Sequence, residues 1–85
     1  MEPSILYQRE YGMVRLRLRE LMDQRRINRN QMARRIGVRF EVVDKWYQGE
    51  VEKLDLDILA RLCFVLGCQA GELLEYSGPG SDTVE

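Results

Sequence analysis

A glycine between two short amphipathic segments constrains the fold of this chain more than any other feature. The stretch MARRIGVRFEVVDKWYQG, residues 32–49, keeps a helical apolar spacing up to Gly37 and resumes it afterwards. Glycine adopts the positive φ that ends a helix without a steric penalty. Ala33 provides a small side chain for a helix crossing, and Val43 and Trp46 point back to a shared core. This spacing predicts a helix-turn-helix rather than two unrelated helices.

The rest of the apolar spacing predicts an all-α domain of five helices. Asn28 is a favourable N-cap, and Gln31 three residues later completes a capping-box pattern. Asp55 is the next N-cap candidate, and Gly67 closes the helix that it begins. The predicted helices cover about 15–26, 29–36, 40–48, 56–66 and 70–76.

The two ends of the chain do not share this spacing. Residues 1–13 form an N-terminal extension that is compatible with a strand, a docked arm or a frayed tail. Residues 14–76 form the predicted domain, in which Val14 and Leu16 alternate with arginines before the helical period begins. Residues 77–85, SGPGSDTVE, have the composition of a flexible tail.

Length and residue content exclude several classes of protein. A chain of 85 residues accommodates one domain with a modest core. It has no histidine, and Cys63 and Cys68 alone do not make a zinc site, so we expect both to be small buried residues. The sequence shows no base–nucleophile pair, no set of metal ligands and no phosphate-binding loop, so we expect neither an enzyme nor a cofactor. Neither a signal peptide nor a membrane-spanning helix is predicted, so the expected location is intracellular and cytoplasmic.

Charge is unevenly distributed along the chain, although the net charge is only −1. Residues 9–45 hold eleven Lys or Arg and five Asp or Glu, a net of +6. The remaining residues hold two basic and nine acidic side chains, a net of −7. This asymmetry favours one face for an anionic partner, the alternative being a solvated surface with segregated charges.

The stretch NRNQMARRIGVRFEVVDKWYQG, followed by LDLDILARLCFVLGCQAGELLEY, resembles the lambda-repressor-like, Cro-type helix-turn-helix family. The resemblance covers about residues 14–76 and includes small stand-alone transcriptional regulators. It implies a compact five-helix bundle. The second helix of the helix-turn-helix would enter the major groove of double-stranded DNA. It also implies a homodimer on inverted repeats. Repression by occupying an operator is the simplest mechanism for so short a chain.

The resemblance also implies which residues contact DNA. Asn28 and Arg29 stand at the cap and phosphate-contact positions of the first helix of the helix-turn-helix. A helix N-terminus and an arginine both suit phosphates. The base-reading positions hold Arg39, Phe40, Glu41 and Lys45, and the flanking backbone positions hold Gln48 and Lys53.

The second helix of the helix-turn-helix departs from the family pattern in the polarity of some of its side chains. Phe40 replaces a polar residue and could contact thymine methyls or a protein. Glu41 can accept from cytosine N4, and Asp44 can pair with Lys45 or with an arginine. A second hypothesis therefore keeps the fold for a protein-interaction module, such as an antitoxin or accessory factor. In that module Phe40, Glu41 and Asp44 contact the partner.

Two segments offer a surface for the predicted homodimer. One is the N-terminal segment ILYQREY, in which Ile5, Tyr7 and Tyr11 could pair as a strand across a two-fold axis. The other is the end of the domain, where Leu74 and Tyr76 remain partly exposed. Tyrosines suit interfaces, which favours the N-terminal segment.

Overall fold

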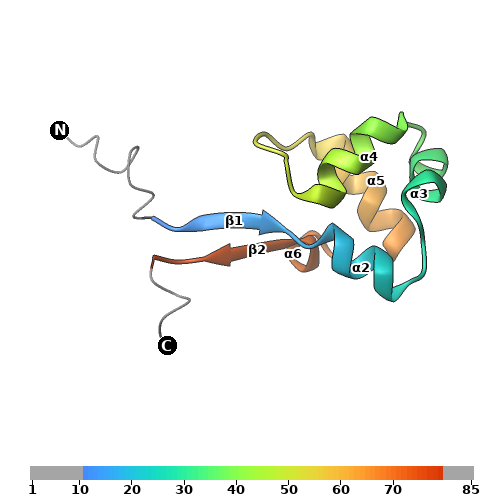
Figure 1. Ribbon diagram of the computed structural model, residues 1–85. Coiled ribbons are helices and arrows are strands. Elements are labelled where there is room, and N and C mark those ends of the chain that lie inside the picture. The colour runs from blue at the N-terminus through green and yellow to red at the C-terminus, as the bar shows by residue number, and fades with distance from the viewer. Residues whose placement is uncertain (1–10, 80–85) are drawn as a thin grey trace.

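Five helices form the body of the molecule, and two short strands leave it side by side (Figure 1). The computed structural model describes residues 11–79. Ile5 and Tyr7 of the predicted interface lie outside them. The five-helix bundle and the short N-terminal strand are confirmed. The elements are β1 (Met13–Leu16), α2 (Leu18–Gln24), α3 (Arg29–Ile36), α4 (Phe40–Gln48), α5 (Leu56–Leu66), α6 (Ala70–Leu73) and β2 (Leu74–Ser77).

Local signals place the ends of the central helices. The Asn28 side chain accepts from the Gln31 N–H at 2.8 Å, and Gln31 Oε1 accepts from the Asn28 N–H at 2.9 Å. Two backbone N–H groups at the start of α3 are thereby satisfied. Asp55 caps α5 in a similar way by accepting from the N–H groups of Asp57 and Ile58. Gly37 ends α3 with φ 74° and ψ 39°, the left-handed conformation that the sequence predicts.

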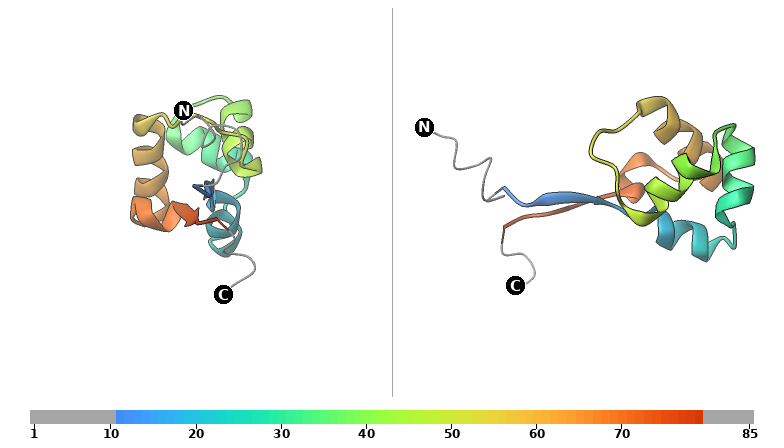
Figure 2. Two further views of the ribbon diagram at one scale, coloured as in Figure 1. Left: turned by 90° about the vertical axis from the view of Figure 1, so that its left-hand side faces the viewer. Right: turned by 45° about the horizontal axis from the view of Figure 1, so that its top comes forward.

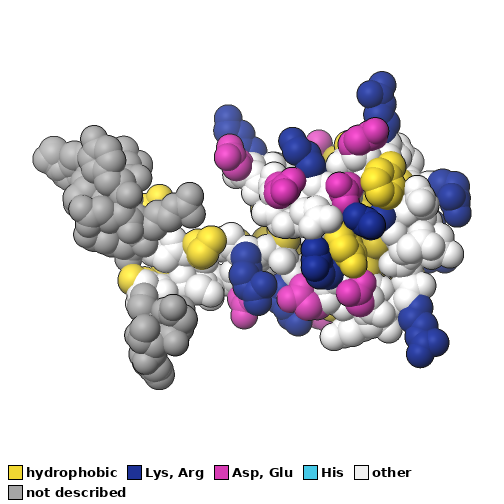
Figure 3. Space-filling view, viewed as in Figure 1, with side chains coloured by type: hydrophobic (Ala, Val, Ile, Leu, Met, Phe, Trp, Pro, Cys, Tyr) yellow, Lys and Arg dark blue, Asp and Glu magenta, His cyan; other side chains and the backbone are white. Residues whose placement is uncertain are grey.

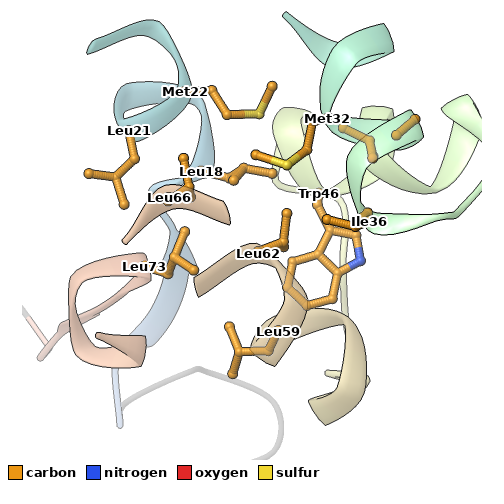
Figure 4. Packing of buried hydrophobic residues seen from close by; sticks show 12 residues of the cluster. Leu18, Leu21, Met22, Met32, Ile36, Trp46, Leu59, Leu62, Leu66 and Leu73 are labelled. Carbon is orange, nitrogen blue, oxygen red and sulfur yellow. The ribbon is translucent and has the colours of Figure 1, made fainter. Parts of the chain in front are cut away.

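Apolar side chains from all five helices meet in one core (Figure 4). Trp46 and Val43 face it from α4, and Ala33 lies buried where α3 packs against its neighbours, as predicted. Deleting one buried leucine from such a core costs about 2–5 kcal/mol. The buried residues are Leu18, Leu21, Met22, Met32, Ala33, Ile36, Val43, Trp46, Leu59, Leu62, Leu66 and Leu73.

The first and last predicted helices are wrong in their extent. The first was expected over 15–26, but β1 occupies Met13–Leu16 and α2 spans Leu18–Gln24. Alternation of apolar residues with arginines is a strand pattern, and here it has a strand partner. The last was expected over 70–76, but α6 ends at Leu73 and the chain continues as β2. Pairing with β1 outweighs the helical spacing at this end.

The two strands form what we call the ribbon, an antiparallel pair in which Met13 lies opposite Ser77 and Leu16 opposite Leu74. Figures 1 and 2 show the ribbon projecting away from the helices. The chain enters it through Gly12, with φ 85°, beside Ser77. A Cβ on Gly12 would lie 2.1 Å from the Ser77 carbonyl oxygen, so only glycine fits there.

The two cysteines are free and pack against the core, and they are half-buried rather than buried as expected. Burial raises the pKa of the Cys68 thiol, and nearby Cys63 adds to the effect. Among residues 11–79, no helix has the length and apolar character needed to cross a membrane.

Candidate nucleic-acid interface

The helix-turn-helix consists of α3, a short turn and α4. The inner side of α4 carries Val43 and Trp46, which are buried. Its outer side carries Glu41, Lys45 and Gln48, spaced four and three residues apart and all exposed. This spacing places the three polar side chains along one stripe of the helix. The outer stripe of α4 is therefore free to meet a partner.

Two contacts hold the turn in place. The Gly37 N–H donates to the Ala33 carbonyl at 2.9 Å, which closes the last turn of α3. Arg61 on α5 donates from Nη1 to the Ile36 carbonyl at 2.7 Å, so α5 satisfies a carbonyl that the end of α3 leaves free. Arg61 also pairs with Asp57 at 2.7 Å. The angle between α3 and α4 thus depends on α5.

Arg29 lies at the centre of the candidate interface. Its Nη1 atom contacts Asp44 Oδ1 at 2.5 Å. Its guanidinium carbon lies 5.5 Å from the centre of the Phe40 ring and 5.0 Å from that of Tyr47. Such distances allow cation–π attraction from two rings at once. The first turn of α3 is thereby joined to two successive turns of α4, and Asp44 pairs with an arginine, one of the two possibilities that the sequence left open.

A second arginine extends this arrangement onto α2. The Arg19 guanidinium carbon lies 4.8 Å from the centre of the Tyr47 ring, and its Nη2 donates to Gln48 Oε1 at 2.8 Å. The Tyr47 hydroxyl donates to Asp23 at 3.0 Å. This hydrogen bond, together with burial, raises the pKa of Tyr47 above its usual 10.0. Arg19, Tyr47, Arg29 and Phe40 form what we call the arginine–aromatic row.

The other predicted contact residues lie around this row. Arg39 is the N-cap residue of α4 and is exposed, without a side-chain capping bond. Lys45 and Lys53 line one hollow of about 610 Å³ beside Trp46, together with Glu50 and Glu52. Acidic side chains therefore lie beside both lysines.

The surface carries mixed charge rather than one basic patch. Figure 3 shows hydrophobic and Lys or Arg side chains in a row over the helical body, with Asp and Glu side chains beside them. Some arginines of the basic half form hydrogen bonds within the fold and are not available to a partner. Arg25 Nε donates to the Leu66 carbonyl at 2.8 Å, at the end of α5. Net charge along the sequence therefore overstates the positive potential that a partner meets.

The structure brings some of the predicted contact residues together and leaves others apart. Arg29 lies over the Phe40 ring, and Arg29 and Gln48 both donate to Asp44. Asn28 uses its side-chain oxygen as a helix cap. Glu41 and Lys45 lie on the free outer stripe of α4. The assignment of these residues, with Arg39 and Lys53, to DNA contact remains a prediction.

Sequence reasoning missed three members of this site, Arg19, Asp23 and Tyr47. Tyr47 is half-buried against the core and lies between two arginines. Its spacing of seven residues from Phe40 places both rings on one side of α4, which is a signal that the sequence contains. Arg19 and Asp23 belong to α2, and no local pattern connects them to α4.

The fold and this surface define a helix-turn-helix protein: two helices on a glycine turn, backed by three others, with the second helix exposed along its outer stripe. Residues 17–79 match the Cro/C1-type HTH DNA-binding domain. This match covers most of the chain, and the chain belongs to that family. No curated protein matches it in sequence.

The fold also matches a solved structure, the crystal structure of a candidate DNA-binding protein from Bacteroides fragilis. The TM-score is 0.67 at 16% sequence identity, and the match covers 74% of this chain and 100% of the other. At this identity the likeness supports the five-helix architecture alone.

Proposed function

We propose that this protein is a sequence-specific regulator of transcription that binds double-stranded DNA as a homodimer and represses by occupying its operator. Membership of the Cro/C1-type family supports DNA binding. In this proposal α4 enters the major groove and the first turn of α3 lies against the phosphate backbone. In this proposal the protein acts in the cytoplasm.

The observation that carries this proposal is the exposed outer stripe of α4. Glu41, Lys45 and Gln48 are exposed on the second helix of the helix-turn-helix, and the Gln48 side chain also accepts from Arg19 of α2. Lys45 can donate to guanine O6 or N7, and Glu41 can accept from cytosine N4. Arg29, beside this stripe, can donate to a phosphate.

A second candidate function is a protein-interaction module on the same fold, such as an antitoxin or accessory factor. The pairing of Arg29 with Asp44 favours it, because the pair lowers the positive charge offered to DNA. Phe40 is 38% exposed beside that pair and supplies apolar surface for a protein. Phe40, Glu41 and Asp44 are the contact residues in this alternative.

Salt dependence of binding to random duplex DNA separates the two functions. A DNA-binding protein releases counterions from each phosphate that it neutralises, so its affinity falls steeply as salt rises. We expect measurable binding at low salt and a clear loss at higher salt. A protein-interaction module shows little binding at either concentration, and that result contradicts the proposal.

Two variants then test the individual contacts. Arg29→Ala is expected to weaken binding to all sequences about equally and to reduce the salt slope by about 1, as loss of one phosphate contact does. Lys45→Ala is expected to relax preference at one base position in a selection from a random library. Arg34→Ala, an exposed arginine on the same helix as Arg29, is the control and should bind as the wild type does. Wild-type behaviour of both Arg29→Ala and Lys45→Ala contradicts the proposed groove contact.

A further inference from the structure

The ribbon has one apolar face that begins at the core and continues beyond it. Val14 lies opposite Tyr76, and Leu16 lies opposite Leu74. Because side chains alternate along a strand, these four share one face. Leu16 and Leu74 pack against the helical core. Val14 and Tyr76 lie farther out and are 59% and 64% exposed.

The opposite face of the ribbon carries all of its charge. Arg15 lies opposite Glu75, and their side chains pair at 2.6 Å. Met13 and Ser77 complete this face. Among residues 13–16 and 74–77, the Val14 face therefore has no charged side chain, and the other face is neutral in sum.

The alternation of hydrogen-bonded and non-hydrogen-bonded pairs along the ribbon brings the side chains of Val14 and Tyr76 close together. The Arg17 N–H donates to the Leu73 carbonyl at 2.8 Å, one step beyond the strands, so that pair is of the hydrogen-bonded type. By alternation, Val14 and Tyr76 form a pair of the other type, whose side chains approach more closely. The Tyr76 hydroxyl also donates to the Tyr11 carbonyl at 2.6 Å. The outer part of the ribbon is thus an ordered apolar surface.

We propose that a second copy of this chain covers the Val14–Tyr76 face, so that the ribbon is the dimerisation element. An isolated two-stranded sheet is at best marginally stable in water, which leaves this ribbon in need of a partner surface. A two-fold axis brings the same neutral apolar pair from each copy together without like-charge repulsion. A charged partner gains nothing from a face that carries no charge.

This arrangement leaves the DNA-facing helices free. Figures 1 and 2 show the ribbon leaving the body on the side away from α3. The Val14–Tyr76 face includes no residue of α3 or α4. Stable interfaces bury about 800 Å² per partner. Two exposed side chains per copy supply less than that, so we expect a micromolar rather than a nanomolar dimer.

Sedimentation of the full chain without DNA tests this interface. We expect the wild type to shift with concentration from 10.0 kDa toward twice that mass. Val14→Lys places a charge on the apolar face of each copy, and we expect it to stay monomeric. Met13→Lys is the matched control: it lies next along the same strand, is similarly exposed at 48%, and belongs to the opposite face. It should dimerise as the wild type does.

Other outcomes overturn the proposal. The ribbon is not the interface if the wild type stays monomeric at high concentration, or if Val14→Lys and Met13→Lys both dimerise. α5 offers an alternative surface, since Leu56 and Phe64 are 73% and 88% exposed. Loss of the dimer in Phe64→Lys, with Val14→Lys still dimeric, assigns the contact to α5 instead. Circular dichroism of each variant verifies the fold.

The ribbon interface rests on one part of the proposed function, the homodimer. The ribbon interface and DNA binding can therefore fail separately. A monomer that binds duplex DNA contradicts the ribbon dimer and leaves DNA binding intact. A dimer that binds no DNA at low salt contradicts the proposed function and leaves the ribbon assignment intact.

Discussion

At the scale of single residues, the Arg29 guanidinium can pair either with Asp44 or with a phosphate of DNA. Arg29 stands where a phosphate contact is predicted, yet its side chain pairs with Asp44 and lies against two rings. The rings hold the guanidinium in place, which lowers the entropic cost of presenting it to a ligand. Asp44 neutralises it and repels phosphates. DNA binding at this site therefore requires a phosphate to compete with a carboxylate.

Removing that carboxylate should strengthen DNA binding. We expect Asp44→Asn to bind random duplex DNA about two- to fivefold more tightly, the size set by one exposed ion pair. Fluorescence anisotropy at low salt measures it. Asp57→Asn, which removes the carboxylate paired with Arg61 on α5, is the matched control and should leave affinity nearly unchanged. Equal or weaker binding by Asp44→Asn means that Asp44 makes a favourable contact with DNA.

The hydroxyl of Tyr47 predicts a pH dependence of stability. Its hydrogen bond to Asp23 needs the protonated phenol, and the folded pKa is raised above 10.0 mainly by that bond. The stabilisation is complete below the pKa of an unfolded tyrosine and is lost as pH rises through the higher folded value.

Urea unfolding of wild type and Tyr47→Phe at several pH values measures this effect. The wild type should be more stable at neutral pH, and its advantage should vanish at strongly alkaline pH. Absorbance titration gives a second readout, in which Asp23→Asn should lower the pKa of Tyr47 toward 10.0. An advantage that stays constant across the alkaline range contradicts the assignment of the hydrogen bond.

At the scale of elements, the helix-turn-helix depends on one backbone conformation and on one supporting helix. Gly37 is left-handed, and Arg61 of α5 binds the carbonyl just before it. The turn therefore joins α3 to α4 and also fixes both against α5. This dependence explains how a turn of three residues holds two short helices that would be marginal alone.

Gly37→Val should destabilise the domain by roughly 1–2 kcal/mol, because a β-branched residue resists positive φ. The atom nearest to an added Cβ is Arg61 Nη1 at 3.9 Å, so the cost comes from backbone strain rather than a clash. Urea or thermal unfolding measures it. Gly71→Ala is the control: it lies in α6, meets nothing within 4 Å, and should be neutral or stabilising. An unchanged midpoint for Gly37→Val contradicts the left-handed turn.

At the scale of the whole molecule, the ribbon and the helix-turn-helix lie in different parts of the structure (Figure 1). One projecting element can join two copies while the helical body of each contacts DNA. The two segments predicted as alternative dimer surfaces meet in the described residues, since Tyr76 bonds the backbone of Tyr11. A two-fold dimer doubles the number of base pairs read.

Half-site spacing tests this arrangement on DNA. Two copies should bind a palindrome cooperatively when the half-site centres lie about 34 Å apart, one helical turn. Inserting about 5 base pairs, half a turn, moves one half-site to the opposite side of the duplex and should abolish cooperativity. Gel-shift titrations with both duplexes measure it. Equal cooperativity on the two duplexes contradicts a dimer of fixed geometry.

The parts of the fold that could be predicted from the sequence are those set by near neighbours. Asn28 and Gln31 mark the start of α3 and Gly37 its end, the predicted range 40–48 matches α4, and the structure agrees with each. These signals work because helix caps involve residues three or four positions apart. The core positions Val43 and Trp46 followed from the helical period for the same reason.

Tertiary structure decided what depends on residues far apart in the chain. The spacing of 70–76 favours a helix, but Leu74–Ser77 is a strand because Met13–Leu16 lies beside it. The arginine–aromatic row likewise joins α2, α3 and α4, with Arg19 and Tyr47 separated by 28 positions. Pairing free energy and cation–π attraction act through space, and a local sequence pattern holds no information on which distant segment will be the neighbour.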